Sequence, residues 1–395
     1  MRSLLATLLA TSALIAVSPA HAQKKYGPGV TDTEIKLGQT ISYSGPISFA
    51  GMFGKVMVGY INDINERGGI NGRKINMLSV DDGCSPPKAV EMTRKLVEGD
   101  QVLAMVGSNC TGTQVAVQKY LNSKQVPQLF VAAAGPTLFD HKNFPWTVAF
   151  NYAYEFEGEA FGNYINKHRP NGKIAVLYQN DDAGKAWLSG MKRSLGDRAK
   201  SIVKEQSYEL TDVTIDSQIL ALRESGADVL VDMATSKYVA MTIRKLDSMG
   251  WKPIHLIPNS ASAVGATLAP AGLDKSKGIF TTTWLKAPSD PTWKNDPGMQ
   301  AYLAFMRKRI PASNPDDTIA VFAYALAQAT ELMLRRAGDD LTRENLIKVA
   351  TSFKDVDLPI LQPGIKINIS PDNRYPVRTA RFAEFDGATW VTLKD

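Results

Sequence analysis

Apolar, β-rich runs alternate with amphipathic segments along almost the whole chain. Residues 34–41 (EIKLGQTI) have the pattern of a strand, and residues 53–68 carry apolar side chains at helical spacing. The turn that leads to the next strand-like run, residues 73–82, contains an Asn-Gly pair suited to positive φ. This alternation predicts βαβ units, in which parallel strands form a sheet that helices cover.

The same alternation continues beyond residues 144–151 (FPWTVAFN), an extended segment that we interpret as a crossover. Further strands are expected at residues 102–108, 127–133, 173–179, 201–208, 228–234 and 253–259. Further helices are expected at residues 88–98, 114–121, 155–167, 186–195, 213–224, 238–249, 298–309, 318–336 and 343–351.

Two α/β series in a chain of 395 residues predict two lobes, because one domain usually holds about 100–200 residues. The late helices are more than the second sheet needs, so we expect the chain to return to the first lobe near Trp284 and to cross again near Pro359. The expected lobes are residues 23–150 plus 284–358 and residues 151–283 plus 359–395.

The first 22 residues have the pattern of a secretory signal. They contain Arg2, an apolar run and the small-x-small sequence Ala20-His21-Ala22, so cleavage is expected after Ala22. A membrane anchor is disfavoured because the apolar run is shorter than the ~20 residues that a span needs. The mature chain is therefore expected to be exported to the periplasm and to be soluble.

The net charge of +6 comes from scattered basic residues rather than from a basic patch. Pairs such as Arg335 and Arg336 fall within helical patterns with acidic residues between them, which is typical of solvated helix faces. Nucleic acid is therefore not an expected partner. We expect a monomer without a cofactor.

Two cysteines, Cys84 and Cys110, make an even pair in a chain expected to be exported. Such pairs usually oxidise, and closing this loop would stabilise the fold by about 3 kcal/mol. A metal site is the rival interpretation. It has little support, because the chain has no CxxC motif and His141, His168 and His255 are far apart in sequence.

The loops after the predicted strands are the expected ligand site, because ligands of open parallel sheets bind beyond the carboxyl ends of the strands. In the first lobe these loops contain Ser44 and Ser108 and the uncharged segment AAAGPT, residues 132–137. In the second lobe they are NDDAGKAW, ATSKY and NSASAVG. Their Ser, Thr, Asn and Gly residues favour hydrogen bonding to a small molecule over catalysis.

Templates for enzymes are missing from these loops. The chain has no GxSxG elbow, no phosphate-binding loop and no GxGxxG after a strand. The pairs Asp81-Asp82 and Asp181-Asp182 could suggest a two-carboxylate glycosidase, but both pairs end strands, where Asp commonly caps a turn or helix. We therefore expect no enzymatic activity, with a secreted α/β hydrolase that uses Asp181 or Asp182 as the alternative.

Four segments, SGPISFAGMFG, INERGGINGRKI, VDDGCSPPKAV and VGSNC, resemble the periplasmic leucine/isoleucine/valine-binding family. Members of this family are the receptors of ABC importers for branched-chain amino acids and related solutes. The resemblance covers nearly the whole mature chain. It implies a two-lobed type I binding fold with three hinge crossovers, a disulfide between Cys84 and Cys110, and an ABC permease in the inner membrane as partner.

The resemblance also implies ligand contacts. The family's amino-acid receptors hold the ligand carboxylate with hydroxyl and N–H groups that here correspond to Thr111, Gly112 and Thr113. They also use a loop of Ala-Ala-Thr type, where this chain has Ala132, Ala133 and Ala134. The acid that pairs with the ligand ammonium falls at Asn259 or Ser260, neither of which is charged. Aromatic positions of the family fall on Ala50, Ala183 and Thr235.

These departures favour a ligand other than an ordinary α-amino acid. A buried ammonium without its carboxylate costs about 3–5 kcal/mol, unless another acid such as Asp182 replaces the lost partner. The preferred hypothesis is a periplasmic binding protein for a small carboxylate, such as an aromatic acid. A branched-chain amino acid receptor proper and a sensory receptor that reports to a membrane kinase are the alternatives.

Overall fold

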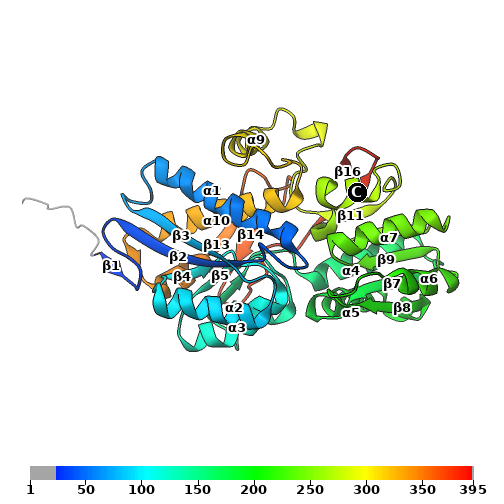
Figure 1. Ribbon diagram of the computed structural model, residues 1–395, viewed down its shortest axis with the longest axis horizontal. Helices are drawn as coiled ribbons and strands as arrows, with labels where there is room; N and C mark the ends of the chain where they lie inside the picture. Colours follow the sequence, from blue (N-terminus) through cyan, green and yellow to red (C-terminus); the bar gives the residue numbers. More distant parts are fainter. Residues whose placement is uncertain (1–23, 394–395) are drawn as a thin grey trace, which may run out of the picture.

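The computed structural model describes residues 24–393 and contains two lobes that lie side by side along its long axis (Figure 1). Each lobe has a mainly parallel sheet with helices packed on its faces. The α/β fold class predicted from the alternating pattern is confirmed. The predicted signal segment, residues 1–22, lies outside the described residues.

The first lobe is built on a five-stranded parallel sheet. Its strands are β2 (Glu34–Ile41), β3 (Lys74–Asp81), β4 (Ala104–Val106), β5 (Gln128–Val131) and β6 (Thr147–Ala149), in the order β3-β2-β4-β5-β6. The helices of this lobe are α1 (Gly51–Glu66), α2 (Pro86–Arg94), α3 (Thr111–Ser123), α9 (Pro297–Arg309), α10 (Thr318–Ala337) and α11 (Arg343–Ala350). Two small pairs accompany the sheet: β1 (Lys25–Tyr26) with β12 (Asp340–Leu341), and β13 (Phe353–Val356) with β14 (Ile367–Ile369).

The second lobe is built on a seven-stranded mixed sheet. Its strands are β7 (Ile174–Gln179), β8 (Ile202–Tyr208), β9 (Val229–Met233), β10 (Ile254–Ile257), β11 (Phe280–Thr283), β15 (Arg381–Phe385) and β16 (Trp390–Thr392), in the order β16-β15-β11-β10-β9-β7-β8. The helices are α4 (Tyr154–His168), α5 (Asp182–Leu195), α6 (Asp216–Glu224), α7 (Ser236–Ser248) and the short α8 (Ala269–Ala271). Strand β15 pairs antiparallel with both of its neighbours, β11 and β16, and the other strand pairs of this sheet are parallel.

Helix α10 packs against α1 in the core of the first lobe, as its apolar spacing predicts. Phe322 meets Phe53 edge to face with ring centroids 5.0 Å apart, and Tyr324 meets Tyr60 at 5.2 Å. The buried face of α10 runs along most of its length. Within residues 24–393, no helix combines the length and apolar character that a membrane span requires.

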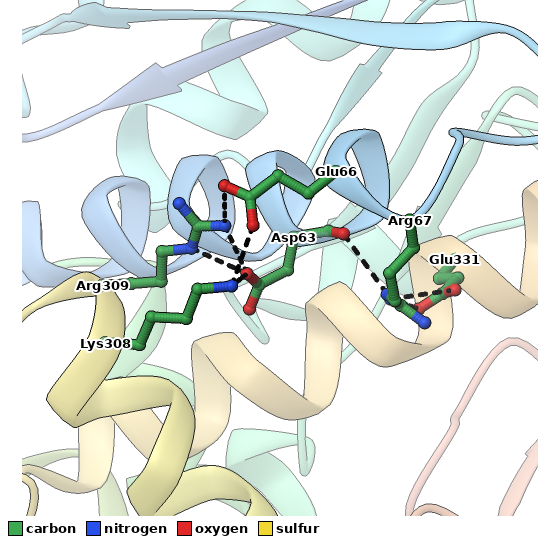
Figure 2. A network of polar contacts seen from close by, with 6 residues as sticks. All are labelled: Asp63, Glu66, Arg67, Lys308, Arg309 and Glu331. Atoms are coloured by element: carbon green, nitrogen blue, oxygen red, sulfur yellow. Dashed lines mark hydrogen bonds and ion pairs between the residues drawn. The ribbon is translucent and has the colours of Figure 1, made fainter.

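A network of ion pairs and hydrogen bonds connects the late helices α9 and α10 to the early helix α1 (Figure 2). Lys308 of α9 contacts Asp63 and Glu66 of α1 at 2.8 Å each, and Arg309 pairs with the same two carboxylates. Arg67, directly after α1, lies 3.2 Å from Glu331 of α10. The late helices α9 and α10 therefore pack on the first lobe.

Three segments connect the lobes. The first contains Tyr152, which forms a parallel bridge with Val377 in the third, and Trp284 in the second is buried in the core of the first lobe. The third was expected near Pro359, but β14 still pairs with β13, and the chain joins the second sheet only at β15. The last crossover therefore lies between β14 and β15, in the segment that contains Val377, later than the proline suggested.

Several helices begin earlier than the apolar periodicity predicts. Helix α3 begins at Thr111 rather than at residue 114, and α5 begins at Asp182 rather than at residue 186. Their first turns contain small and polar residues, which carry no apolar period. This difference matters for function, because these first turns face the space between the lobes.

Candidate ligand-binding site

A cavity of about 320 Å³ lies between the lobes, at the carboxyl ends of strands from both sheets. This is the position that open parallel sheets favour for ligands. The predicted contact residues that line the cavity are Ala50, Thr111, Ala132, Ala183, Thr235, Asn259 and Ser260. Their contact with a ligand stays a prediction.

Two predicted serines lie outside this lining and form hydrogen bonds with other groups of the protein. The Ser44 hydroxyl donates to the Asp81 carboxylate at 2.6 Å. The Ser108 hydroxyl oxygen accepts the backbone N–H of Thr40 at 3.0 Å, and its side chain is buried. Both serines hold loops beside the cavity rather than line it.

Three more predicted residues lie outside the lining. The Thr113 hydroxyl donates to the backbone carbonyl of Cys110 at 2.9 Å, the residue directly before its helix. Ala134 is buried in a small apolar cluster behind the loop. Asp182 is exposed, so it does not replace the missing partner of a ligand ammonium.

The disulfide between Cys84 and Cys110 is confirmed, with Cα atoms 5.8 Å apart. Both cysteines line the cavity. Cys84 follows β3 and Cys110 directly precedes α3, so the bond fixes the start of α3 to the neighbouring loop. Within residues 24–393, no group of His, Cys, Asp and Glu side chains is arranged to hold a metal ion.

The N-terminal turn of α3 presents free donors to the cavity. No side chain caps this helix, and the first backbone N–H to find an acceptor is that of Gln114, which donates to Cys110. The N–H groups of Thr111, Gly112 and Thr113 therefore have no acceptor among the described residues, and Thr111 and Gly112 line the cavity. Such a turn favours an anion through its N–H groups and the helix dipole.

The N-terminus of α5, across the cavity, is already occupied by a carboxylate of the protein. Asp181 accepts the N–H groups of Ala183 and Gly184 at 3.0 Å each, and it also accepts the amide of Gln179. Burial raises the pKa of Asp181. Among the cavity-lining residues that the structure describes, Asp181 is the one acid, and none is Lys, Arg or His. The sequence prediction had named Asp182, one residue later, as the acid that could pair with a ligand ammonium.

Aromatic side chains from both lobes form the apolar walls. Phe49, Phe53 and Phe322 line the first-lobe side, whereas Tyr154 and Trp187 line the second-lobe side with ring centroids 4.1 Å apart. Burial raises the pKa of Tyr154 to about 12, so its hydroxyl stays protonated.

Neither the positions of the loops nor the apolar periodicity marks these aromatic residues as cavity-lining. Trp187 lies four residues after Ala183, on the same face of α5, and that spacing could have identified it. Phe322 gave no such signal, because its helix lies far from the other lining segments in sequence.

The first turn of α10 joins the cavity wall through Thr318, Ile319 and Phe322, and Asp317 caps this helix. The Asp317 carboxylate accepts the N–H of Ile319 at 2.9 Å, and burial raises its pKa to about 6. Because this pKa is raised in the folded state, the folded protein holds the proton more tightly than the unfolded chain does. We expect this group to lower stability as pH rises from about 4 to about 6, by at most about 3 kcal/mol.

The variant D317N keeps a good capping side chain without the titrating charge. We therefore expect D317N to be more stable than the wild type at neutral pH, and the difference to vanish near pH 4. Urea unfolding of both proteins across this range measures it. Parallel pH profiles of the two proteins would contradict the assignment.

Comparison with known proteins places the chain among periplasmic binding proteins. The sequence profile described as "Periplasmic binding protein" matches residues 34–389. A Leu/Ile/Val-binding protein homolog from Brucella melitensis is 25% identical over 335 residues, covering 83% of this chain and 86% of the relative.

Two solved structures share the fold. A branched-chain amino acid ABC transporter protein from Thermus thermophilus with bound valine superposes with a TM-score of 0.82 at 18% identity, covering 93% of this chain and 97% of the other. A solute-binding protein from R. palustris in complex with benzoate has a TM-score of 0.77 at 22% identity, covering 91% and 95%. The predicted resemblance to the Leu/Ile/Val-binding family is confirmed.

Proposed function

The chain belongs to the periplasmic binding protein family, of the branched-chain amino acid transporter type, and we propose that it is an exported receptor for a small organic acid. In this proposal the two lobes close over the acid and present it to an ABC permease in the inner membrane. The cleaved signal segment and the periplasmic location belong to the same proposal.

The observation that carries the proposal is the uncapped first turn of α3 in a cavity whose described lining residues include no basic side chain. Three N–H groups without acceptors, beginning at Thr111, can hold a carboxylate that the rest of the cavity has no cation to attract. The apolar walls, with Phe53, Phe322 and Trp187, suit the body of an aromatic or branched aliphatic acid.

An ordinary α-amino acid fits this cavity poorly because no acid is free for its ammonium. Asn259 and Ser260, where the family pattern expects that acid, are uncharged and line the cavity. Asp181 already accepts two backbone N–H groups at the N-terminus of α5. Burying an ammonium without a partner costs about 3–5 kcal/mol.

Solved structures with this fold contain ligands of both classes. The same fold holds valine in the Thermus protein and benzoate in the R. palustris protein. The benzoate complex supports a carboxylate without an amine as a ligand of this architecture. The valine complex supports the alternative, a branched-chain amino acid receptor, against which the occupied Asp181 argues.

Ligand contacts on both sides of the cavity would favour the closed arrangement of the lobes. Thr111 and Phe53 come from the first lobe, and Trp187 and Asn259 come from the second. A ligand that contacts both pairs binds the closed arrangement more tightly than the open one, and this difference in affinity stabilises the closed state. The chain would bend at the three segments that connect the lobes.

A thermal-shift screen of the mature protein tests the proposal. The panel contains amino acids, aromatic acids, aliphatic acids, amides and short diacids. A ligand at about 100 times its Kd adds about 2.7 kcal/mol of stability, which is easily resolved. We expect monocarboxylic acids to give the largest shifts. Strong stabilisation by leucine, with little by any acid that lacks an amine, would refute the proposal.

A further inference from the structure

Glu157 is a buried acid that lies behind the second-lobe wall of the cavity. It occupies the first turn of α4, only 3% of its surface is exposed, and it is not among the residues that line the cavity. Burial raises its pKa, and hydrogen bonds to the carboxylate oppose that effect. An ionised carboxylate in such a place needs donors on all sides.

The donors come from three different elements. The Trp187 indole N–H of α5 donates to one carboxylate oxygen at 2.7 Å. The other oxygen accepts the backbone N–H of Asn259 at 2.8 Å and the hydroxyl of Thr282 at 2.5 Å. Two of these three residues, Trp187 and Asn259, line the cavity. One carboxylate thus fixes an aromatic wall and a polar loop relative to each other.

We propose that Glu157 is a positioning residue that sets the second-lobe half of the ligand site through Trp187 and Asn259. This inference rests on the proposed function in that it assumes a ligand in the same cavity. It goes further because it assigns control of that cavity to a side chain that does not touch the ligand.

A carboxylate is the one side chain of this length that satisfies all three donors. The indole N–H of Trp187 and the backbone N–H of Asn259 can only donate. In the isosteric variant E157Q, one oxygen is replaced by an NH₂ group, which must face one of these two donors. That donor then loses its acceptor, and its segment has to shift.

Glu159 provides a matched control on the same helix. Its carboxylate pairs with Arg193 at 2.6 Å on the surface of the lobe, with 31% of the side chain exposed. The variant E159Q makes the same chemical change two residues away, where no cavity residue depends on it.

The test compares wild type, E157Q and E159Q in two measurements. The first is the ¹⁵N–¹H resonance of the Trp187 indole, assigned through the variant W187F among the six tryptophans. The second is the Kd, by isothermal titration, of the tightest-binding acid from the thermal-shift panel. We expect E157Q to move the Trp187 resonance and to weaken binding by about 10-fold or more. E159Q should do neither.

Folded E157Q that binds the acid as the wild type does would overturn the inference, as would an unmoved Trp187 resonance. If no acid binds the wild type, the proposed function fails, and the resonance still decides whether Glu157 holds Trp187. If E157Q does not fold, T282V replaces it, because this change removes a single donor outside the cavity lining. In T282V the Glu157 oxygen that accepts the Asn259 N–H loses its second donor, so the carboxylate is held less firmly and binding should weaken several-fold. Unchanged affinity would overturn the inference.

Discussion

Replacing Gly112 with aspartate is expected to weaken binding of an organic acid by about 100-fold or more without unfolding the protein. A Cβ atom at this position would meet no atom within 4 Å, so the new side chain has room. Side chains in a helix tilt toward its N-terminus, which here faces the cavity. The added carboxylate would occupy the free N–H groups of α3 and repel a second carboxylate by roughly 3 kcal/mol.

The variant G112N separates charge from size, because asparagine has nearly the same shape as aspartate and no charge. We expect G112N to lose far less affinity than G112D in isothermal titration. The two variants should also differ in stability, since a negative charge in the first turn of a helix stabilises it by about 0.3–1 kcal/mol. Equal losses of affinity in both variants would show that the start of α3 does not hold the anion.

Removing the disulfide is expected to have the largest effect on stability. The bond between Cys84 and Cys110 closes a loop of 26 residues, and the variant C84S/C110S should lose about 3 kcal/mol of unfolding free energy. It should also bind the acid less tightly, because the bond fixes the start of α3 in the cavity wall. Urea unfolding and isothermal titration measure the two effects.

Reduction of the wild-type protein supplies the control for this variant. A thiol reductant should bring wild-type stability down to that of C84S/C110S and should leave the variant unchanged. A loss below about 1 kcal/mol in the variant would show that this bond contributes less than loop closure predicts.

Much of the fold was predictable because its information is local. The strand at residues 34–41 and the buried helix at residues 318–336 follow directly from apolar spacing, and the structure has them within a residue. The starts of α3 and α5 were predicted too late, since their polar first turns carry no period. The last crossover was misplaced because a proline marks a break in local structure and says nothing about which sheet the chain joins next.

The site was predictable where it depends on loops that follow strands, and unpredictable where it depends on rotamers or on distant segments. Ala50, Thr111 and Asn259 line the cavity because the carboxyl ends of parallel strands meet at one edge. Two aspartates, Asp181 and Asp182, stand at the start of α5. The sequence does not tell which of them lines the cavity, because this depends on the conformation in which Asp181 caps the helix. The contribution of Phe322 depends on where the first turns of α10 lie relative to the cavity, which the apolar spacing of that helix does not specify.

The most direct test of the central claim compares an acid with the α-amino acid that has the same carbon skeleton. Suitable pairs are 4-methylpentanoate with leucine and 3-phenylpropanoate with phenylalanine. Isothermal titration of the mature wild-type protein measures both dissociation constants under the same conditions. Because the proposal puts the anion at the start of α3, and the one acid of the described lining, Asp181, already caps α5, we predict that the acid of a pair binds about 100-fold or more tighter than its amino acid. Equal or tighter binding of the amino acid in both pairs would contradict the account.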